Sequence, residues 1–237
     1  MTCNVEHRAR SSGASYDEQP KWSPDGRSFA FREGSARILK SALDGSPPQA
    51  LADLKGNNLS GWSPDGRFVL FGVSLPETGN DLFALPVDQA RPPIHLTADR
   101  GTEQQGAFSP DGRWVAFAAE RAGRMEVFAA AAEYRGDGLR LGNSRIAVST
   151  DGADRALWRA DNKEMFFKGL DGWLYAVAVR PDGDAIAFGK PVKLFAGINY
   201  WNWDVMPGGQ RFIVVEEPHA ASQTVRVLTN WTARLKQ

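Results

Sequence analysis

Short hydrophobic stretches recur along the chain, and a polar turn comes directly before each of the clearest ones. Residues 28–31, 68–71 and 114–117 are three such stretches, composed mostly of aromatic and aliphatic residues. Stretches of this length, bounded by turn residues, are typical of β-strands rather than helices. The pattern therefore predicts a chain built from many short strands.

The turn before these stretches has one sequence, Ser-Pro-Asp-Gly-Arg, in three copies. Proline fixes φ at the first central position, aspartate can accept hydrogen bonds from the following backbone amides, and glycine adopts positive φ without a steric penalty. We therefore interpret the motif as a hairpin turn and its residues as structural. These residues are Pro24, Asp25, Gly26, Pro64, Asp65, Gly66, Pro110, Asp111 and Gly112.

The residues on either side of each turn are also expected to be structural. The aromatic residues before the turns, Trp22, Trp62 and Phe108, are predicted to belong to the strand core. The arginines after the turns are expected to cover a strand edge or pair with a neighbouring carboxylate; they are Arg27, Arg67 and Arg113.

Two weaker copies extend the repeat. Ala160 and Pro207 occupy the position of the motif proline, and Asn162, which tolerates positive φ better than most residues, takes the glycine position of the fourth copy. The motif positions 24, 64, 110, 160 and 207 are separated by 40, 46, 50 and 47 residues. This period fits one four-stranded blade per repeat, so we predict an all-β fold, a β-propeller with five four-stranded blades.

The predicted blades form a single domain over residues 1–237. They span residues 17–55, 57–98, 102–150, 154–196 and 200–237. The fifth contains only three predicted strands, so we expect residues 4–10 to supply the fourth and close the ring. The alternative is that these blades are part of a ring of six or more. Residues 134–142 are expected to form a loop insertion, and residues 181–183 a hairpin turn inside the fourth blade.

Composition and charge exclude several classes of partner. The chain has 28 basic and 28 acidic residues and a formal net charge of zero, so we expect no binding to nucleic acid. One cysteine permits no internal disulfide and no zinc spacing, and we expect neither a metal nor a cofactor.

The hydropathy pattern also bears on location. No apolar run approaches the roughly 20 residues of a membrane span, so we expect no membrane insertion. The first 20 residues lack the apolar segment of a signal peptide. We expect a cytoplasmic protein as the sequence stands, and a periplasmic or other extracytoplasmic one if it is a fragment of a longer protein.

The repeated Ser-Pro-Asp-Gly-Arg turn followed by a short apolar strand resembles the TolB-type, WD-like β-propeller repeats of bacterial proteins. The second half adds motifs in a characteristic order: residues 148–152, 157–167, 171–177 and 191–195, then 209–212 and 230–236. In this order they resemble the C-terminal propeller of bacterial receptor serine/threonine kinases and of some winged-helix regulators. The resemblance covers nearly the whole chain.

The resemblance implies a sensor or protein-interaction domain, usually outside the membrane. It does not imply kinase activity for this chain. The kinase domain is absent, because no glycine-rich phosphate loop with its lysine strand and no His-Arg-Asp catalytic loop occurs in the sequence.

No catalytic constellation is evident, and we predict that the chain is not an enzyme. The three histidines, His7, His95 and His219, are far apart in sequence, and we expect each at the surface or in packing. No Gly-x-Ser-x-Gly nucleophile motif is present. The competing interpretation is a lyase or hydrolase whose site lies at the mouth of the central channel. A truncated sensor fragment of a receptor kinase is a third.

We predict instead a binding or scaffold propeller that recognises a protein, peptide or glycan, and we expect it to be a monomer. Loops on a rigid scaffold concentrate binding residues, and the segments leading into the innermost strands converge around the central channel. Trp203 is weighed as a core aromatic. The candidate rim residues are Asp17, Glu18, Gln19, Asn57, Asn58, Glu103, Gln104, Gln105, Asp154, Arg155, Tyr200, Trp201 and Asn202.

Overall fold

In the computed structural model, residues 17–34, 36–54, 57–88, 91–197, 203–216 and 224–229 are described. They form five antiparallel sheets. The first sheet contains β1 (Asp17–Trp22), β2 (Ser28–Glu33), β3 (Arg37–Ala42) and β4 (Gln49–Asp53). The second contains β5 (Asn57–Trp62), β6 (Phe68–Leu75), β7 (Gly79–Pro86) and β8 (Ile94–His95).

The third sheet contains β9 (Glu103–Phe108), β10 (Trp114–Arg121), β11 (Arg124–Arg135) and β12 (Gly138–Ala147). The fourth contains β13 (Ala153–Trp158), β14 (Glu164–Gly169), β15 (Trp173–Asp182), β16 (Ala185–Phe188) and β17 (Val192–Ala196). The fifth contains β18 (Trp203–Val205), β19 (Arg211–Glu216) and β20 (Thr224–Thr229).

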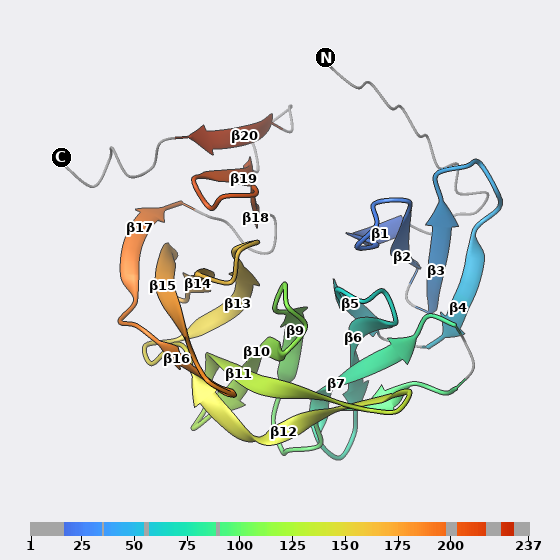
Figure 1. The fold of residues 1–237 in the computed structure, drawn as a ribbon, viewed down its shortest axis with the longest axis horizontal. Coiled ribbons are helices and arrows are strands. Elements are labelled where there is room, and N and C mark those ends of the chain that lie inside the picture. Colours follow the sequence, from blue (N-terminus) through green and yellow to red (C-terminus); the bar gives the residue numbers. More distant parts are fainter. Residues whose placement is uncertain are drawn as a thin grey trace.

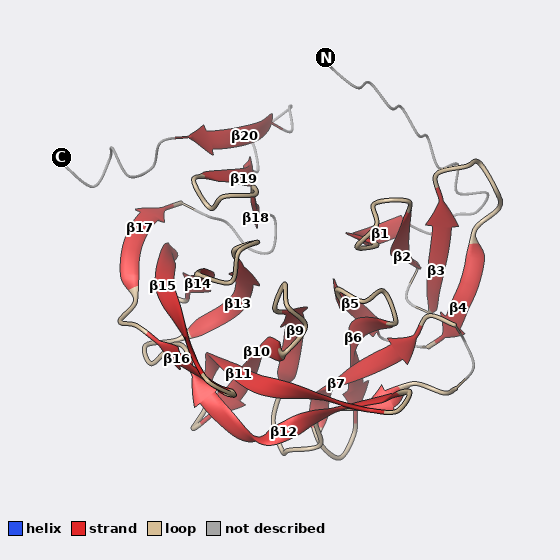
Figure 2. Ribbon diagram, in the orientation of Figure 1, coloured by secondary structure: helices blue, strands red, loops and turns tan. Residues whose placement is uncertain are grey.

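The sheets follow one another around a common centre, with the first strand of each sheet innermost (Figure 1). All the elements described are strands (Figure 2). This radial arrangement confirms the predicted all-β propeller. Across the described ranges no helix has the length and apolar character needed to cross a membrane.

Figure 1 shows the first and last sheets on either side of an opening in the ring of ribbons. Residues 4–10, which we expect to close the ring, lie outside the described residues. Closure by these residues and the number of blades in the complete ring therefore stay predictions.

The Ser-Pro-Asp-Gly turns have the geometry that the repeat requires. Gly26, Gly66 and Gly112 adopt φ of 66°, 76° and 72°. In each copy the aspartate Oδ1 accepts a hydrogen bond from the backbone amide two residues later, at 3.0–3.1 Å. It also accepts one from the serine hydroxyl two residues earlier, at 2.6 Å. Asn162 reaches φ 60° in the fourth copy.

Two motif arginines join neighbouring sheets. Arg67 donates from Nη1 to the carbonyl of Gly136, in the β11–β12 turn, at 3.4 Å. Arg113 Nη2 lies 3.0 Å from Asp184 Oδ1 and donates to the carbonyl of Gly183, in the β15–β16 turn, at 3.3 Å. Each arginine thus links its own turn to the outer hairpin of the next sheet.

That outer hairpin corrects one expectation. Residues 134–142 do not form a loop insertion, because β11 and β12 continue pairing through Tyr134↔Leu139 to Arg135↔Gly138. Leu139 is buried and packs into the core between the second and third sheets, which holds the hairpin in place. The predicted hairpin turn at residues 181–183 is present, with Asp182 paired to Ala185.

The hydrophobic core lies between neighbouring sheets rather than inside one. One cluster joins Phe68 and Leu70 of the second sheet to Val115 and Phe117 of the third. Similar clusters join the first sheet to the second, the third to the fourth, and the fourth to the fifth. The stack of sheets therefore holds each inner strand at a fixed place around the centre.

The motif aromatics follow this packing, with one exception. Phe108 and Trp158 are 8% and 7% exposed, and the indole N–H of Trp158 donates to the carbonyl of Ala107 in the preceding sheet at 3.1 Å. Trp22 is 60% exposed, contrary to the prediction that it belongs to the core. Trp22 belongs to the first sheet, before which the described chain has no sheet against which it could pack.

Candidate functional site

The innermost strands begin at one end of the ring, which we call the inner rim: residues 17–19, 57–58, 103–105 and 153–155. The repeated turns lie at the opposite end of these strands, which we call the turn rim.

Gln19 connects the first two sheets at the inner rim. Its Nε2 donates to Asn58 Oδ1 at 3.3 Å, and its Oε1 accepts from the amide of Leu59 at 2.8 Å. These two predicted rim residues therefore contact each other.

Gln19 and Gln105 share an unusual backbone. Their φ angles are 55° and 58°, and each lies where the inner strand shifts register against its neighbour. Residues other than glycine rarely adopt such angles, and those that do cluster at bulges and functional sites. Each bulge interrupts the alternation of side chains along its strand, so Gln19 and Gln105 do not point to the face that a regular strand would give them.

Three charged side chains form an axial cluster: Lys21 on β1, Arg155 on β13 and Asp204 on β18. Lys21 interacts electrostatically with both Arg155 and Asp204. The first and fourth sheets lie on opposite sides of the centre (Figure 1), so this interaction crosses the middle of the ring. The cluster thus joins residues 21, 155 and 204, which are far apart in sequence.

Burial perturbs both cations of the cluster. Burial, and then repulsion from Arg155, lower the pKa of Lys21 to about 8, while Asp204 opposes the change. Burial also lowers the pKa of Arg155, against the attraction of Asp204 and Asp154. The Arg155 guanidinium lies over the indole of Trp203, with Cζ 5.5 Å from the ring centroid.

Asp154 is held beside the axial cluster by an ion pair. Its Oδ2 lies 3.2 Å from Lys168 Nζ on β14, and both side chains are largely buried. Burial raises the pKa of Asp154, and Lys168 and Arg155 oppose that rise.

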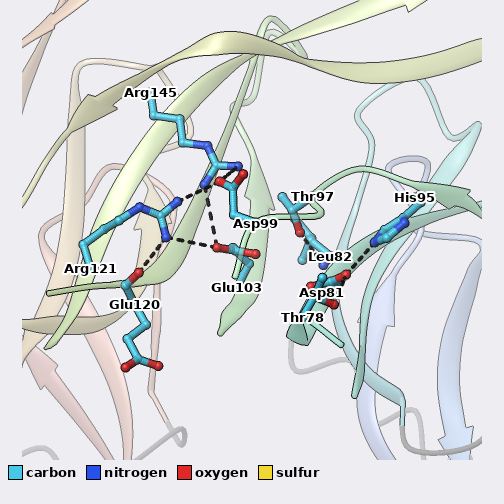
Figure 3. Close-up of polar contacts among 10 residues, drawn as sticks. All are labelled: Thr78, Asp81, Leu82, His95, Thr97, Asp99, Glu103, Glu120, Arg121 and Arg145. Carbon is cyan, nitrogen blue, oxygen red and sulfur yellow. Dashed lines mark hydrogen bonds and ion pairs between the residues drawn. The ribbon is translucent and has the colours of Figure 1, made fainter. Parts of the chain in front are cut away.

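Glu103 is placed differently from an accessible rim residue, since its side chain is fully buried. Figure 3 shows Arg121 and Arg145 converging on Glu103 and Asp99. Arg121 Nη1 lies 3.1 Å from Glu103 Oε1, and Arg145 Nη2 lies 2.6 Å from Asp99 Oδ2. Burial raises the pKa of Glu103, and the two arginines oppose that rise. The network ties strands β9, β10 and β12 together and is structural.

His95 pairs with the buried carboxylate of Asp81 (Figure 3). His95 Nε2 lies 2.6 Å from Asp81 Oδ2, which also accepts a hydrogen bond from the Thr78 hydroxyl at 2.8 Å. The imidazole stacks on Phe83 with centroids 4.4 Å apart. The Nε2 atom of His95 contacts Asp81, and one face of its ring packs on Phe83. This geometry fits the packing role that the sequence analysis expected for His95.

The remaining candidates divide into three groups. Gln104 is partly buried on β9 and pairs with Ala118. The backbones of Asp17, Glu18 and Asn57 lie in the strands β1 and β5, but their side chains are outside what the structure describes. Tyr200, Trp201 and Asn202 lie outside the described residues altogether.

Sequence reasoning missed Lys21 and Asp204, and alignment of the repeats contains the signal. Both stand one residue before the motif aromatic position, where the second, third and fourth repeats have Gly61, Ala107 and Leu157. Small or apolar residues at this position allow neighbouring sheets to pack; the Cβ of an alanine at 61 would lie 2.9 Å from the carbonyl oxygen of Gly106. A charge at this position in the first and last repeats distinguishes the two sheets that flank the opening.

No family model matches the chain. Among curated proteins, an uncharacterised protein of Agrobacterium fabrum is 29% identical over 45% of this chain and 37% of its own length. The uncharacterised peptidase YuxL of Bacillus subtilis is 29% identical over 45% of this chain and 22% of its own length. The chain therefore spans well under half the length of these relatives.

Solved structures are similar in fold. TolB from Acinetobacter baumannii aligns over 91% of this chain and 52% of its own, with a TM-score of 0.72 and 18% identity. The dihydro-heme d1 dehydrogenase NirN aligns over 93% of this chain and 46% of its own, with a TM-score of 0.57 and 19% identity. At these identities the similarity concerns the fold, which is a TolB-like β-propeller.

Proposed function

We propose that this chain is a non-catalytic binding propeller whose partner, a protein or peptide, binds at the centre of the ring from the inner rim. The observation that carries the proposal is the axial cluster: Lys21, Arg155 and Asp204 come from three sheets and interact electrostatically, and the Arg155 guanidinium lies over the buried indole of Trp203. Burial of charge destabilises a fold unless the charges are fully compensated, so strongly perturbed groups gathered at one place indicate a functional site.

The surroundings of the cluster support recognition rather than catalysis. His95 is the one histidine within the described ranges, and it is committed to Asp81 and Phe83. The inner rim offers carboxamides, Gln19, Asn58 and Gln105, which donate and accept hydrogen bonds without changing charge. The resemblance to propellers attached to receptor kinases supports a sensing role for such binding.

The proposal is tested with a panel of fluorescently labelled decapeptides of acidic, neutral and basic composition, whose binding to the chain is followed by anisotropy. We expect at least one class to bind with saturation, and we expect Arg155→Ala to weaken that binding. Arg113→Ala, at the turn rim, is the matched control and should leave affinity unchanged. Absence of saturable binding by every class, or equal sensitivity to both substitutions, would contradict the proposal.

A further inference from the structure

We propose that a hollow at the turn rim, between the third and fourth sheets, binds a neutral carbohydrate. This site is separate from the inner rim, and its ligand belongs to a different class from the peptide partner proposed there. The hollow has a volume of about 370 Å³, which falls within the roughly 300–1,000 Å³ of small-ligand pockets.

The walls of the hollow come from two sheets. The third sheet supplies its repeated turn, the start of β10 and part of β11, and the fourth sheet supplies the β15–β16 turn. Arg113 Nη2 donates to Asp184 Oδ1 and to the carbonyl of Gly183, so this arginine shapes one side of the hollow through contacts with the protein itself. The side chains that the argument uses are Asp111, Arg113, Trp114, Tyr134 and Asp184.

The hydroxyl of Tyr134 is a donor without a partner. Its oxygen lies beside Gly112, 3.4 Å from the position that a Cβ would take there, and it makes no hydrogen bond with a described residue. The Tyr134 ring is held by the Arg67 guanidinium, 5.1 Å from its centroid, and by the ring of Phe68, at a centroid distance of 6.3 Å. Burial raises the pKa of Tyr134 to about 12, so the hydroxyl keeps its proton at neutral pH.

The indole N–H of Trp114 is a second donor of this kind. Trp114 is 8% exposed and lines the hollow, and its N–H has no acceptor among the residues that the structure describes. Buried indole N–H groups are normally paired, as that of Trp158 is with the carbonyl of Ala107. A ligand in the hollow can supply the missing acceptor.

Acceptors line the same space. Asp111 Oδ1 is engaged by the Ser109 hydroxyl at 2.6 Å and the Arg113 amide at 3.1 Å, whereas Asp111 Oδ2 has no such contact within the described ranges. A smaller hollow of about 50 Å³ adjoins the first, since Asp111, Arg113 and Trp114 line both. There the buried side-chain oxygen of Asn162 has no donor in the described part of the chain.

This combination favours a neutral carbohydrate. A hydroxyl both donates and accepts, so the hydroxyls of a sugar can donate to Asp111 and accept from Tyr134 and Trp114. An anion would meet the carboxylates of Asp111 and Asp184, and a cation would meet the Arg113 guanidinium. A neutral sugar avoids both repulsions, and the C–H faces of its ring can pack on the aromatic side chains.

The experiment is isothermal titration calorimetry of the whole chain with disaccharides. The neutral probes are disaccharides of glucose, mannose, galactose and N-acetylglucosamine. Two charged counterparts isolate the effect of charge: the cationic, deacetylated form of the N-acetylglucosamine disaccharide, and digalacturonate, the anionic counterpart of the galactose disaccharide. We expect at least one neutral disaccharide to bind, and its charged counterpart, where one is included, to bind about fivefold or more weakly.

A matched pair of tyrosine substitutions locates the binding. Tyr134→Phe removes one hydroxyl and keeps the ring packed on Phe68, and it should weaken binding about fivefold. Tyr175→Phe makes the same chemical change where the hydroxyl is already bound to Asp171, and it should leave the affinity unchanged. Thermal melts establish that each variant is folded before titration.

NMR spectra of the indole N–H groups give a second readout of place. The resonance of Trp114, assigned with Trp114→Phe, should shift as the sugar is added. The resonance of Trp158 should stay in place, because its N–H is already bound to the carbonyl of Ala107.

The outcomes separate this inference from the proposed function. Absence of binding by every neutral disaccharide, or tighter binding of a charged counterpart, overturns the carbohydrate site. Equal losses in Tyr134→Phe and Tyr175→Phe also overturn it, as does a Trp114 resonance that shifts with a basic decapeptide and with no sugar. In each case the proposed function still depends on the decapeptide panel and on Arg155→Ala.

Discussion

Lys21 illustrates a conflict between stability and function at the scale of one residue. Removing an ammonium from water disfavours its charged form, and the neighbouring Arg155 adds repulsion. An apolar residue would avoid both penalties, as Leu157 does at the same position of the fourth repeat. Retaining a cation there is consistent with the binding role proposed for the centre of the ring.

The lowered pKa of Lys21 gives the pH dependence of stability a definite sign. The folded chain releases this proton near pH 8, whereas the unfolded chain keeps it until about pH 10.5. The unfolded state therefore binds more protons in this window, and the contribution of Lys21 to stability rises with pH from about 8 to 10.5.

We expect Lys21→Met to raise the melting temperature more at pH 7 than at pH 10, measured by circular dichroism without ligand. A difference between mutant and wild type that is equal at both pH values would contradict this.

The buried network around Glu103 leads to a second prediction at this scale. Glu103→Ala removes the fully buried partner of Arg121 and Arg145, and the loss of a buried partner costs about 3 kcal/mol. Asp99→Ala removes the carboxylate from the solvent side of the same network, where the side chain is 52% exposed, and should cost less than about 1 kcal/mol. Urea denaturation of both variants measures the two values. Similar losses would mean that Glu103 contributes no more than an exposed pair.

At the scale of elements, close approach of the innermost strands decides which side chains are allowed. Gly61 on β5 faces the backbone of Gly106 on β9 in the next sheet. A larger side chain at position 61 would push the second sheet away from the third. It would thereby disrupt the apolar cluster that the two sheets share. Glycine fits at this position because the contact between β5 and β9 is made by backbone atoms, which leave no room for a side chain.

Alanine substitution tests this contact. Gly61→Ala would place Cβ 2.9 Å from the carbonyl oxygen of Gly106, and we expect it to destabilise the fold by about 2 kcal/mol. Gly72→Ala on the adjacent strand β6 is the control, since its Cβ would meet only Asp81 O at 3.8 Å. That variant should change stability by less than about 1 kcal/mol. A larger loss in the control, measured by urea denaturation, would show that the inter-sheet approach is not the limiting contact.

At the scale of the whole molecule, the first sheet differs from those inside the arc. Trp22 and Trp158 occupy the same position of the repeat, yet they are 60% and 7% exposed. Trp158 packs in the core between the third and fourth sheets. Trp22 contacts Phe29 of its own sheet, with ring centroids 5.6 Å apart. Its strand β1 lies beside the opening of the ring (Figure 1).

A matched pair of substitutions measures this difference. Trp158→Ala should cost about 4 kcal/mol, because it leaves a cavity between two sheets. Trp22→Ala should cost about 1 kcal/mol, the contribution of one exposed aromatic pair. Equal large losses would mean that the Trp22 side of the first sheet is covered in solution. Light scattering of the wild type would then show whether a second copy covers it.

The repeat alone was sufficient to predict the class of fold. The Ser-Pro-Asp-Gly turns depend on backbone preferences of four adjacent residues, and the strands on hydrophobic patterns a few residues long. Such local signals are complete within the sequence, which is why the β-propeller and the hairpin at residues 181–183 could be predicted. The loop expected at residues 134–142 failed because Leu139 is held by a neighbouring sheet, which the local sequence does not contain.

The sequence by itself therefore determined the repeated strand–turn–strand unit and the order of the sheets. The tertiary structure decided the role of each polar residue that the sequence places at the inner rim. Glu103 and Arg155 both occur in polar inner-rim segments, but Glu103 is buried in an ion network of the third sheet, whereas Arg155 interacts with Lys21 of the first sheet and Trp203 of the fifth. Lys21 and Asp204 acquire a role only when the ring brings β1, β13 and β18 together. Burial and electrostatic interaction depend on distances between residues remote in sequence, and those distances exist only in the folded chain.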